Sequence, residues 1–249
     1  MAYTTINDPS AYFQTKLYTG GTAEAKTFDG NSNLKPDWFW SKKRGAVQSH
    51  QTADSVRGIA NSLRTDTTGA EYTNSETAEL ASFDTNGFTF SGTGDTYNGT
   101  YQSSDYVAWC WSAGGGTTAS NTDGSINSTV SVNTTSGFSI VSYTGTGANA
   151  TFGHGLGVTP SMVIIKGRNP SNDEDWATWH TGLNNAQHYL RLNSTSATIT
   201  VFTNRYQSQS ATTIGIGSST EVNENTKNYI AYCFAEKKGF SKFGSYTGS

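Results

Sequence analysis

The chain has 249 residues, only 14% of them charged, with a formal net charge of -3 and a pI near 5.8. A general nucleic-acid binder would show a basic face, and Lys42-Lys43-Arg44 is too short a cluster to provide one. No apolar run reaches the roughly 18 to 20 residues of a membrane span, and the first residues lack the basic start and apolar middle of a secretory signal. We therefore expect no nucleic-acid partner, no membrane insertion, and synthesis in a cytoplasm.

Hydroxyl and amide side chains supply most of the polarity of this chain. Its 27 Gly residues and frequent Ser, Thr and Asn suit short strands joined by many turns. Large apolar side chains are also plentiful, with 6 Trp, 13 Tyr and 12 Phe. Disordered sequences lack such apolar surface, so we expect a folded, all-β chain.

In chain order, the sequence predicts five segments. They are an N-terminal arm at 1–12, a first β-sandwich repeat at 13–113, a linker rich in Gly, Ser, Thr and Asn at 114–136, a second β-sandwich repeat at 137–239, and a final segment at 240–249. The final segment either closes the second repeat as a strand or begins a third repeat. Both alternatives rest on Gly239-Phe240-Ser241, which echoes Gly137-Phe138-Ser139.

Three landmarks that recur in the same order support the two repeats. Tyr18-Thr19-Gly20 recurs as Tyr143-Thr144-Gly145, at an offset of 125 (143 minus 18). Two further sets recur at offsets of 124 (160 minus 36) and 123 (228 minus 105), namely Pro36, Lys42 and Arg44 as Pro160, Lys166 and Arg168, and Asp105–Trp111 as Asn228–Phe234. Leu63-Arg64 falls against Leu190-Arg191 after a small insertion. Offsets this similar indicate an internal duplication.

The second repeat shows short runs of β-branched and aromatic residues, bounded by Gly, Asn, Ser or Pro. These runs predict strands at 139–143, 161–166, 188–192, 197–202 and 228–234. Only 54–63, 76–83 and 182–187 look briefly helical, and we expect them to be single turns that cross the edge of a sandwich.

The strands that carry the two cysteines predict the packing, because alternate residues face opposite sides of a sheet. In the first repeat one side holds Tyr106, Ala108 and Cys110, and the other holds Val107, Trp109 and Trp111. Both sides are apolar, which is typical of a central strand or of one whose outer face is covered. We expect the bulky side to fill the core between the sheets. Cys110 and Cys233 are expected to be buried free thiols rather than a disulfide.

Sequence motifs for catalysis and for cofactors are weak in this chain. No nucleophile elbow, phosphate-binding loop or zinc-protease motif occurs, and the four histidines are too scattered for a zinc site. Asp173, Glu174 and Asp175 form the densest acidic group and could hold Ca²⁺, although a solvated loop is the favoured interpretation. We expect no enzyme activity and no cofactor.

Candidate ligand-binding residues come from aromatic and basic side chains near turns. Exposed Trp176 and Trp179 could stack on sugar rings, with His180, Arg168 and Arg44 as polar neighbours, although a core position is the commoner role for Trp. The repeated basic residues at the two strand exits have three interpretations. They could form a structural ion pair with Asp37, a contact between repeats, or a shared ligand site.

The first twenty residues, which begin Met1-Ala2-Tyr3-Thr4-Thr5, resemble the N-terminus of virion structural and tail-fibre-like proteins of marine bacteriophages, including cyanophages. The resemblance continues over the whole chain through Asp29-Gly30-Asn31-Ser32, Lys35-Pro36-Asp37-Trp38, Asp54-Ser55-Val56-Arg57-Gly58, Tyr106–Trp111 and Gly239–Gly248. Those proteins carry the unit in tandem and are similar to concanavalin-like jelly rolls. The second repeat departs from the pattern, with Trp179-His180-Thr181-Gly182-Leu183 in place of the Asp-Ser-Val-Arg-Gly motif.

The resemblance implies a non-enzymatic virion protein, made in the cytoplasm of a host bacterium. We expect a place in the tail fibre or receptor-binding apparatus, where rigid sandwiches present loops to a host surface glycan. Other virion proteins are expected partners, and analogy with fibre proteins suggests a homo-oligomer, in particular a trimer. Two alternatives remain at this point, a decoration protein of the capsid or tail and a glycan depolymerase built on a lectin-like sandwich. The lack of a convincing acid pair counts against the depolymerase.

Overall fold

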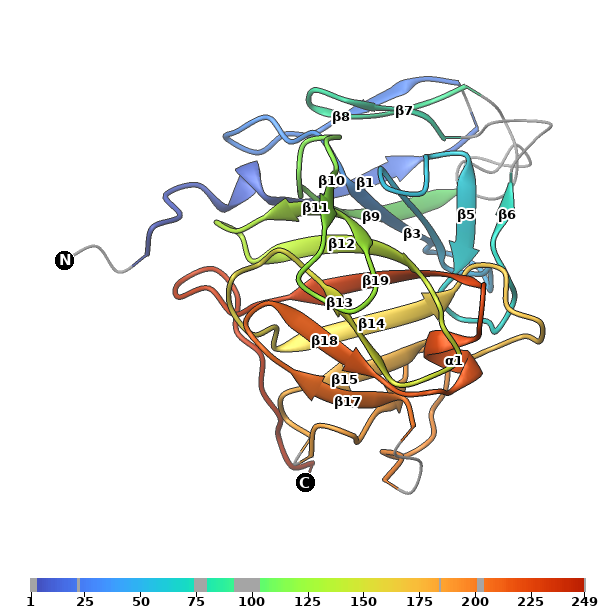
Figure 1. Cartoon of the computed structure of the whole chain (residues 1–249). Helices are drawn as coiled ribbons and strands as arrows, with labels where there is room; N and C mark the ends of the chain where they lie inside the picture. Colours follow the sequence, from blue (N-terminus) through green and yellow to red (C-terminus); the bar gives the residue numbers. More distant parts are fainter. Residues whose placement is uncertain are drawn as a thin grey trace. The chain divides into compact units, whose positions relative to one another are not determined.

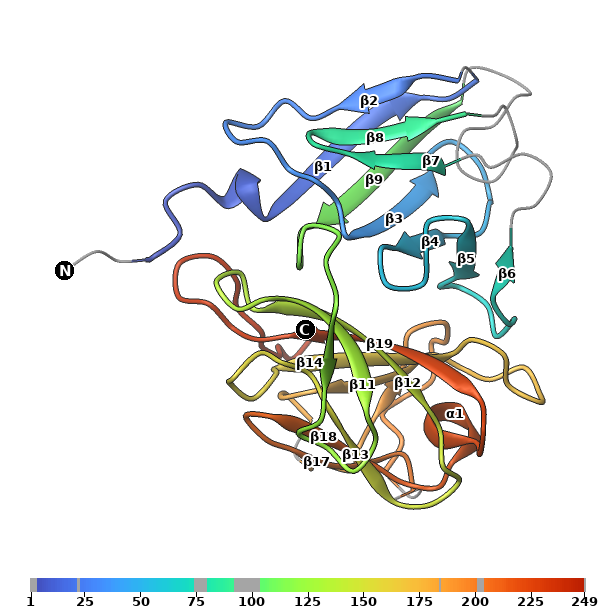
Figure 2. The ribbon, with the colours of Figure 1, turned by 45° about the horizontal axis from the view of Figure 1, so that its top comes forward.

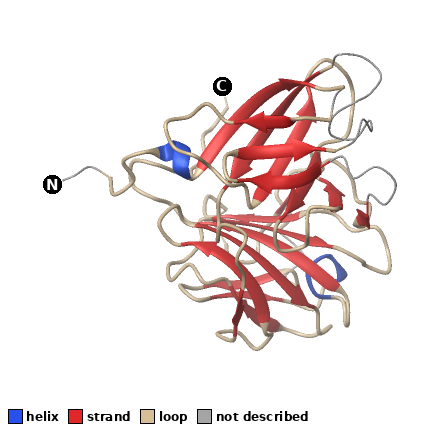
Figure 3. Ribbon diagram, turned by 90° about the horizontal axis from the view of Figure 1, so that it is seen from above, coloured by secondary structure: helices blue, strands red, loops and turns tan. Residues whose placement is uncertain are grey.

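A computed structural model of the chain describes residues 4–21, 23–73, 80–91, 104–183, 185–200 and 204–248. Strands make up nearly all of its regular structure, and the helical turns are short (Figures 1 and 3). Within the described residues, no helix is both long and apolar enough to span a bilayer. The chain divides into an N-terminal unit, Asp8–Thr117, and a C-terminal unit that comprises Thr118–Ser249 with Met1–Asn7. The all-β fold is thus confirmed.

The N-terminal unit is a sandwich of two antiparallel sheets (Figure 2). Its larger sheet has the order β1 (Phe13–Thr19), β9 (Asp105–Trp111), β3 (Trp38–Lys43), β4 (Gln51–Asp54), β5 (Asn61–Arg64) and β6 (Tyr72–Thr73). Its smaller sheet has the order β2 (Ala25–Thr27), β8 (Gly87–Phe90) and β7 (Leu80–Asp84). Aromatic rings such as Phe39, Phe88 and Phe90 fill the core of the unit. A short 3-10 turn, η1 (Pro9–Ala11), precedes β1.

The C-terminal unit repeats this architecture with an extended larger sheet. Its order is β10 (Ala119–Asn121), β11 (Ser128–Asn133), β12 (Phe138–Thr144), β19 (Asn228–Phe234), β14 (Met162–Gly167), β15 (Ala177–His180) and β16 (Leu190–Arg191). The smaller sheet has the order β13 (Ala150–Gly153), β18 (Thr213–Ile216) and β17 (Tyr206–Gln209). One helical turn, α1 (Thr220–Asn223), begins after the N-cap Ser219, whose hydroxyl accepts a hydrogen bond from the Glu221 amide.

Strand pairing has the same register in both units. Phe13 lies opposite Trp111 in the β1–β9 pair, as Phe138 lies opposite Phe234 in the β12–β19 pair. The inner tyrosines of these pairs also match. The rings of Tyr18 and Tyr106 stack with centroids 5.3 Å apart, and those of Tyr143 and Tyr229 also stack at 5.3 Å. A β-bulge interrupts β7 and β17 at equivalent places. The order β1-β9-β3-β4-β5 in the N-terminal unit therefore matches β12-β19-β14-β15-β16 in the C-terminal unit, with the same register and a similar bulge.

The segment expected as a linker, 114–136, is instead largely part of a sheet. It contains β10 and β11, and β11 pairs along β12 from Thr129↔Ser142 to Asn133↔Phe138. The many Ser, Thr and Asn residues of this segment led to the prediction of a linker. Strands of a sheet with one solvated face can be polar at alternate positions, so such a composition does not exclude strands. Only Val130 supplies a large, fully buried side chain to the core from these two strands.

The final segment is not the closing strand of the C-terminal unit. After an isolated bridge between Lys237 and Ser241, residues 242–248 have no regular structure, and Tyr246 is almost fully exposed. Phe243 nevertheless lies near the ring of Phe234, with centroids 6.3 Å apart. The other alternative, the start of a third repeat, stays a prediction.

The cysteine strands are central, and the small side faces the core. Tyr106, Ala108 and Cys110 belong to the buried core cluster of the N-terminal unit, whereas Trp109 and Trp111 lie on the opposite face. This corrects the expectation that the bulky side fills the core between the sheets. Ala108 and Cys110 leave room for the surrounding aromatic rings, which supply the bulk instead.

Both cysteines are free and buried, as predicted. Burial raises the pKa of Cys233 to about 12 and that of Cys110 well above its ordinary value. These thiols are therefore protonated at neutral pH and act as small apolar side chains.

Smaller segments also differ from expectation. In place of a strand at 197–202, Ile199 makes only an isolated bridge with Tyr189, and residues 201 and 202 lie outside the described part. The expected helical turns at 54–63 and 76–83 end in β5 and β7, with 76–79 undescribed. The described residues of 182–187 form turns.

Candidate functional site

A lysine near the end of β3, and another near the end of β14, hold the loops that follow these strands. In the N-terminal unit, the Lys42 ammonium donates to the carbonyls of Ala46 (3.1 Å) and Gln48 (2.8 Å). In the C-terminal unit, the Lys166 ammonium donates to the carbonyl of Glu174. The two lysines thus shape the loops at 44–50 and 168–176.

An ion pair with Asp37 was one of the three interpretations of the repeated basic residues. The Asp37 carboxylate accepts hydrogen bonds from the amides of Ala113 (2.7 Å), Gly115 (2.8 Å) and Gly116 (2.7 Å), and from the hydroxyl of Ser55 (2.7 Å). Amides and a hydroxyl therefore bind Asp37 in place of a basic side chain. The carboxylate fixes the glycine-rich exit of β9.

The Asp-Ser-Val-Arg-Gly motif forms a buried ion pair with hydrogen bonds to its own backbone. One oxygen of Asp54 accepts from the amides of Val56 and Arg57, and the other lies 2.5 Å from the Arg57 Nε. The Arg57 guanidinium also contacts Glu71 at 2.9 Å and donates to the carbonyl of Asn61 at 3.0 Å. Both charged side chains of the first pair are fully buried. The motif therefore stabilises the turn between β4 and β5, and its two charged side chains are not exposed to a ligand.

A polar hollow lies on the surface of the N-terminal unit, next to β4 and the end of β5. Six residues line it, from the loop after β3, from β4, and from the end of β5, namely Val47, Gln48, Ser49, Gln51, Arg64 and Asp66. Its volume is about 370 Å³. Residues far apart in the sequence meet here because β5 pairs with β4, placing Arg64 opposite Gln51.

Two hydrogen bonds and one cation–π contact hold the walls of the hollow. The Asp66 carboxylate accepts from the amide of His50 at 3.0 Å. The Tyr72 hydroxyl donates to the side-chain oxygen of Gln51 at 2.6 Å, and the Arg64 guanidinium lies over the Tyr72 ring, 5.1 Å from its centroid. Cation–π contact and hydrogen bonding therefore restrict the polar groups before any ligand arrives.

The electrostatics of the hollow suit a neutral, hydroxyl-rich ligand. It presents a guanidinium, Arg64, and a carboxylate, Asp66, with amide and hydroxyl groups between them. Val47, which is fully exposed, adds an apolar surface at the rim. Burial lowers the pKa of the adjacent His50, against an opposing effect of the Asp66 carboxylate. Such donors and acceptors can orient a ligand, and they include no pair of carboxylates for acid–base hydrolysis.

The structure does not bring together the ligand-binding residues that we predicted. Trp176 is fully buried and Trp179 is only 7% exposed, so neither ring offers a face to a sugar. His180 is half-buried at the end of β15, and its Nδ1 accepts from the amide of Gly182 at 2.9 Å. Arg168 lies half-buried after β14, while Arg44 is exposed in the other unit.

The acidic turn in the C-terminal unit is engaged by cations of the protein itself. Asp175 forms an ion pair with Arg191 at 2.7 Å and accepts from the side-chain amide of Asn193 at 2.7 Å. In the described ranges, no group of three or more His, Cys, Asp or Glu residues could hold a metal ion. The structure therefore does not bring Asp173, Glu174 and Asp175 together as the predicted Ca²⁺ site.

Sequence reasoning missed the partner that completes this ionic cluster. Glu221, in α1, is 1% exposed and contacts the guanidinium groups of Arg191 (3.3 Å) and Arg205, and the hydroxyl of Tyr189 (3.3 Å). The N-cap Ser219 two residues earlier was the available signal. It predicts a helical turn, but not which cations the turn would meet.

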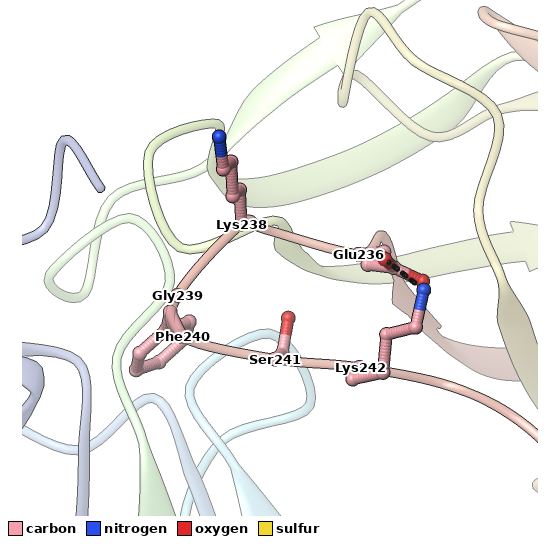
Figure 4. A pocket seen from close by; sticks show the side chains of 6 residues that line it. All are labelled: Glu236, Lys238, Gly239, Phe240, Ser241 and Lys242. Carbon is pink, nitrogen blue, oxygen red and sulfur yellow. Dashed lines mark hydrogen bonds and ion pairs between the residues drawn. The ribbon is translucent and has the colours of Figure 1, made fainter. Parts of the chain in front are cut away.

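A second hollow, of about 430 Å³, lies in the turn at 236–242 of the C-terminal unit (Figure 4). Figure 4 shows the Lys242 ammonium against the Glu236 carboxylate. The two groups form an ion pair 2.7 Å apart. The hydrogen bond from Lys242 lowers the pKa of Glu236. Because one short, exposed segment makes the whole hollow, it has less fixed geometry than the hollow beside Arg64.

The fold and the hollow together define an all-β sandwich protein with a polar surface site. Comparison with family models places the chain in the family described as "Domain of unknown function (DUF7483)", which matches residues 8–249. The chain belongs to this family. A search of curated proteins and a search of solved structures found no match.

Proposed function

We propose that this protein is a non-enzymatic structural component of a bacteriophage virion, part of the tail fibre or receptor-binding apparatus, and that it contacts a host surface glycan. The virion setting is supported by the resemblance in sequence, above all by the first twenty residues. Glycan contact is supported by the hollow beside Arg64, the single observation that carries it. Other virion proteins are the proposed structural partners.

The hollow has the chemistry that binding to sugar hydroxyls requires. Arg64 offers several N–H donors in a plane, and Asp66 offers acceptor oxygens across the same hollow. The position of Arg64 over Tyr72 reduces the conformational entropy lost when a ligand binds. A shallow open site of this kind favours contact with an extended polymer over capture of a small free molecule.

The matching registers of the two units support an internal duplication of a concanavalin-like jelly roll. We propose that the copies share their framework and differ in their loops, because loops on a rigid scaffold carry recognition. Arg191 of the C-terminal copy corresponds to Arg64 in strand register. It forms ion pairs with Asp175 and Glu221. The proposed contact site is the hollow of the N-terminal copy, which Arg64 and Asp66 line together with four other residues.

Cosedimentation of the purified chain with intact host cells tests the proposal. We expect the wild-type chain to pellet with the cells and Arg64→Ala to reduce the bound fraction at least tenfold, because a charge-assisted hydrogen bond contributes about 1.5 to 3 kcal/mol. Lys35→Ala is the matched control, since Lys35 is an exposed cation of the same unit, placed before β3 rather than after it.

Three other outcomes would change the proposed function or the proposed site. Binding to empty capsids or tail tubes, with no binding to cells, would replace the fibre assignment with a decoration protein. Release of reducing sugar from host envelope polysaccharide would indicate a depolymerase. Equal binding by wild type and Arg64→Ala would remove the hollow from the proposal.

A further inference from the structure

Strand β1 is an edge strand of the N-terminal unit. It pairs with β9 along its full length, from Phe13↔Trp111 to Thr19↔Asp105. Among the described residues, no other strand pairs with it, and it stands at the end of the six-stranded order. A strand of seven residues with an open side presents unpaired backbone donors and acceptors.

The backbone hydrogen bonds show which residues of β1 face its open side. Ser112 donates to the carbonyl of Tyr12, and Gly20 donates to the carbonyl of Ser104, so the even-numbered residues bond to β9. In an antiparallel ladder these positions alternate. The N–H and C=O groups of Phe13, Thr15 and Leu17 therefore point away from β9.

The C-terminal unit shows what this side of the strand can bind. The positions equivalent to Phe13, Thr15 and Leu17 in β12 are Phe138, Ile140 and Ser142, and they lie opposite Asn133, Ser131 and Thr129 of β11. The architecture therefore accepts a further antiparallel strand at this edge. The N-terminal unit lacks such a strand among its described residues.

Side chains along β1 are correspondingly exposed. Thr15 and Leu17 are exposed, with Leu17 at 57%, whereas Ile140, the equivalent of Thr15, is buried and Ser142, the equivalent of Leu17, is half-buried. Leu17 and Phe13 lie on the same face of the strand because they are four residues apart. An apolar side chain is thus left in solvent beside an open row of backbone groups.

The occupant that fits this edge best is another β1. When β1 is placed antiparallel to a second copy of itself with Thr15 opposite Thr15, Phe13 of each copy lies opposite Leu17 of the other. Aromatic–aliphatic pairs across antiparallel strands are favourable, and this arrangement removes Leu17 from solvent. The three outward residues of each strand would exchange about six backbone hydrogen bonds across the pair.

We propose that the protein forms a twofold dimer through antiparallel pairing of β1 with β1 of a second copy, centred on Thr15. The pairing joins the two six-stranded sheets into one continuous sheet. Because the same surface is used by both copies, the contact closes at two chains and does not propagate. The proposal is independent of glycan contact, since the edge and the hollow use different strands.

Molar mass in solution tests this pairing. Light scattering after size exclusion should give twice the chain mass of 26.6 kDa for the wild type at micromolar concentration. Thr15→Pro should give the mass of one chain, because it removes an outward N–H while the even-numbered residues keep their bonds to β9. Leu17→Lys should also give one chain, because it sets a cation against the apolar Phe13 of the second copy.

Val158→Lys is the matched control, because Val158 is an apolar residue 43% exposed in a loop of the other unit. It should retain the mass of two chains. Circular dichroism of each variant checks that the fold is intact, and Leu17→Lys, at an exposed position, keeps the test valid if Thr15→Pro does not fold. A wild-type mass of one or three chains, or two folded β1 variants that keep the mass of two chains, would overturn the proposal.

Discussion

The loops that follow β3 and β14 start from the same register but differ in their access to solvent. Lys42, near the end of β3, is half-buried, and Arg64, at the end of β5, is exposed over Tyr72. Lys166, near the end of β14, is completely buried, and Arg191, in β16, is paired with two carboxylates. The difference lies in where the acids are placed, since 173–175 contributes three and α1 one, whereas 44–50 has none. The acids of 173–175 and α1 thus accompany a buried ionic cluster in the C-terminal unit, whereas Arg64 of the N-terminal unit lines a surface hollow.

The largest difference in stability is expected between variants at Asp54 and His180, which occupy equivalent positions in the strand registers of the two units. Asp54→Ala removes one of the two carboxylates that pair with the fully buried Arg57, together with the acceptor for the amides of Val56 and Arg57, and should lower the free energy of unfolding by about 3 to 5 kcal/mol. His180→Ala, at a half-buried side chain, should lower it by less than about 1 kcal/mol. Urea denaturation followed by circular dichroism measures both. Similar losses for the two variants would contradict the contrast between the units.

A pH-dependent effect should distinguish the closed cluster. Burial lowers the pKa of Lys166 from 10.5 to about 8, against the opposing effect of nearby carboxylates led by Asp173. Between these values the unfolded chain binds more protons than the folded chain, so Lys166 makes the folded state more stable as pH rises from 8 to 10.5. Relative to Lys166→Met, the wild type should gain about 3 kcal/mol across this window.

Denaturation of the wild type and of Lys166→Met at pH 7.5 and pH 10.5 measures this gain. The buried tyrosines and thiols also titrate at high pH, but they are common to both proteins and cancel in the difference. A difference that stays constant over the two pH values would show that Lys166 is not desolvated in solution.

The smallest difference in stability is expected between variants at the two equivalent arginines, Arg191 and Arg64. Arg191→Ala should lower the free energy of unfolding by about 1 to 2 kcal/mol, because Glu221 loses one of its cations while it stays buried. Arg64→Ala should change it by less than about 0.5 kcal/mol, since Arg64 is exposed. Thermal unfolding of the two variants side by side resolves the difference. A larger loss for Arg64→Ala would mean that the hollow is a structural part of the unit.

The strands with apolar alternation were predictable from the sequence. The strand at 228–234 was predicted with its observed limits, and the prediction of 139–143 lies within β12. The same alternation indicated that Cys110 and Cys233 are buried. It did not show which face turns toward the core, because both faces are apolar and only the surrounding rings decide between them.

The candidate site was much less predictable. Trp176 and Trp179 were selected as aromatic residues near polar ones, but burial depends on the opposing sheet, which the sequence does not show. The hollow was not predicted because its lining residues become neighbours only when β5 pairs with β4. These residues include Gln48, Gln51, Arg64 and Asp66. Polar loop residues of this kind have no pattern that separates a ligand site from ordinary solvated surface.

The pairing of β1 with β9, and of β12 with β19, has a consequence for synthesis on the ribosome. In each unit a strand near its start is bonded along its full length to the last strand of that unit. Neither sheet can therefore close until nearly the whole unit has been translated, and loop closure over such separations is slow. Nascent chains should remain sensitive to protease until β9 has left the ribosomal tunnel, and then become resistant in a single step.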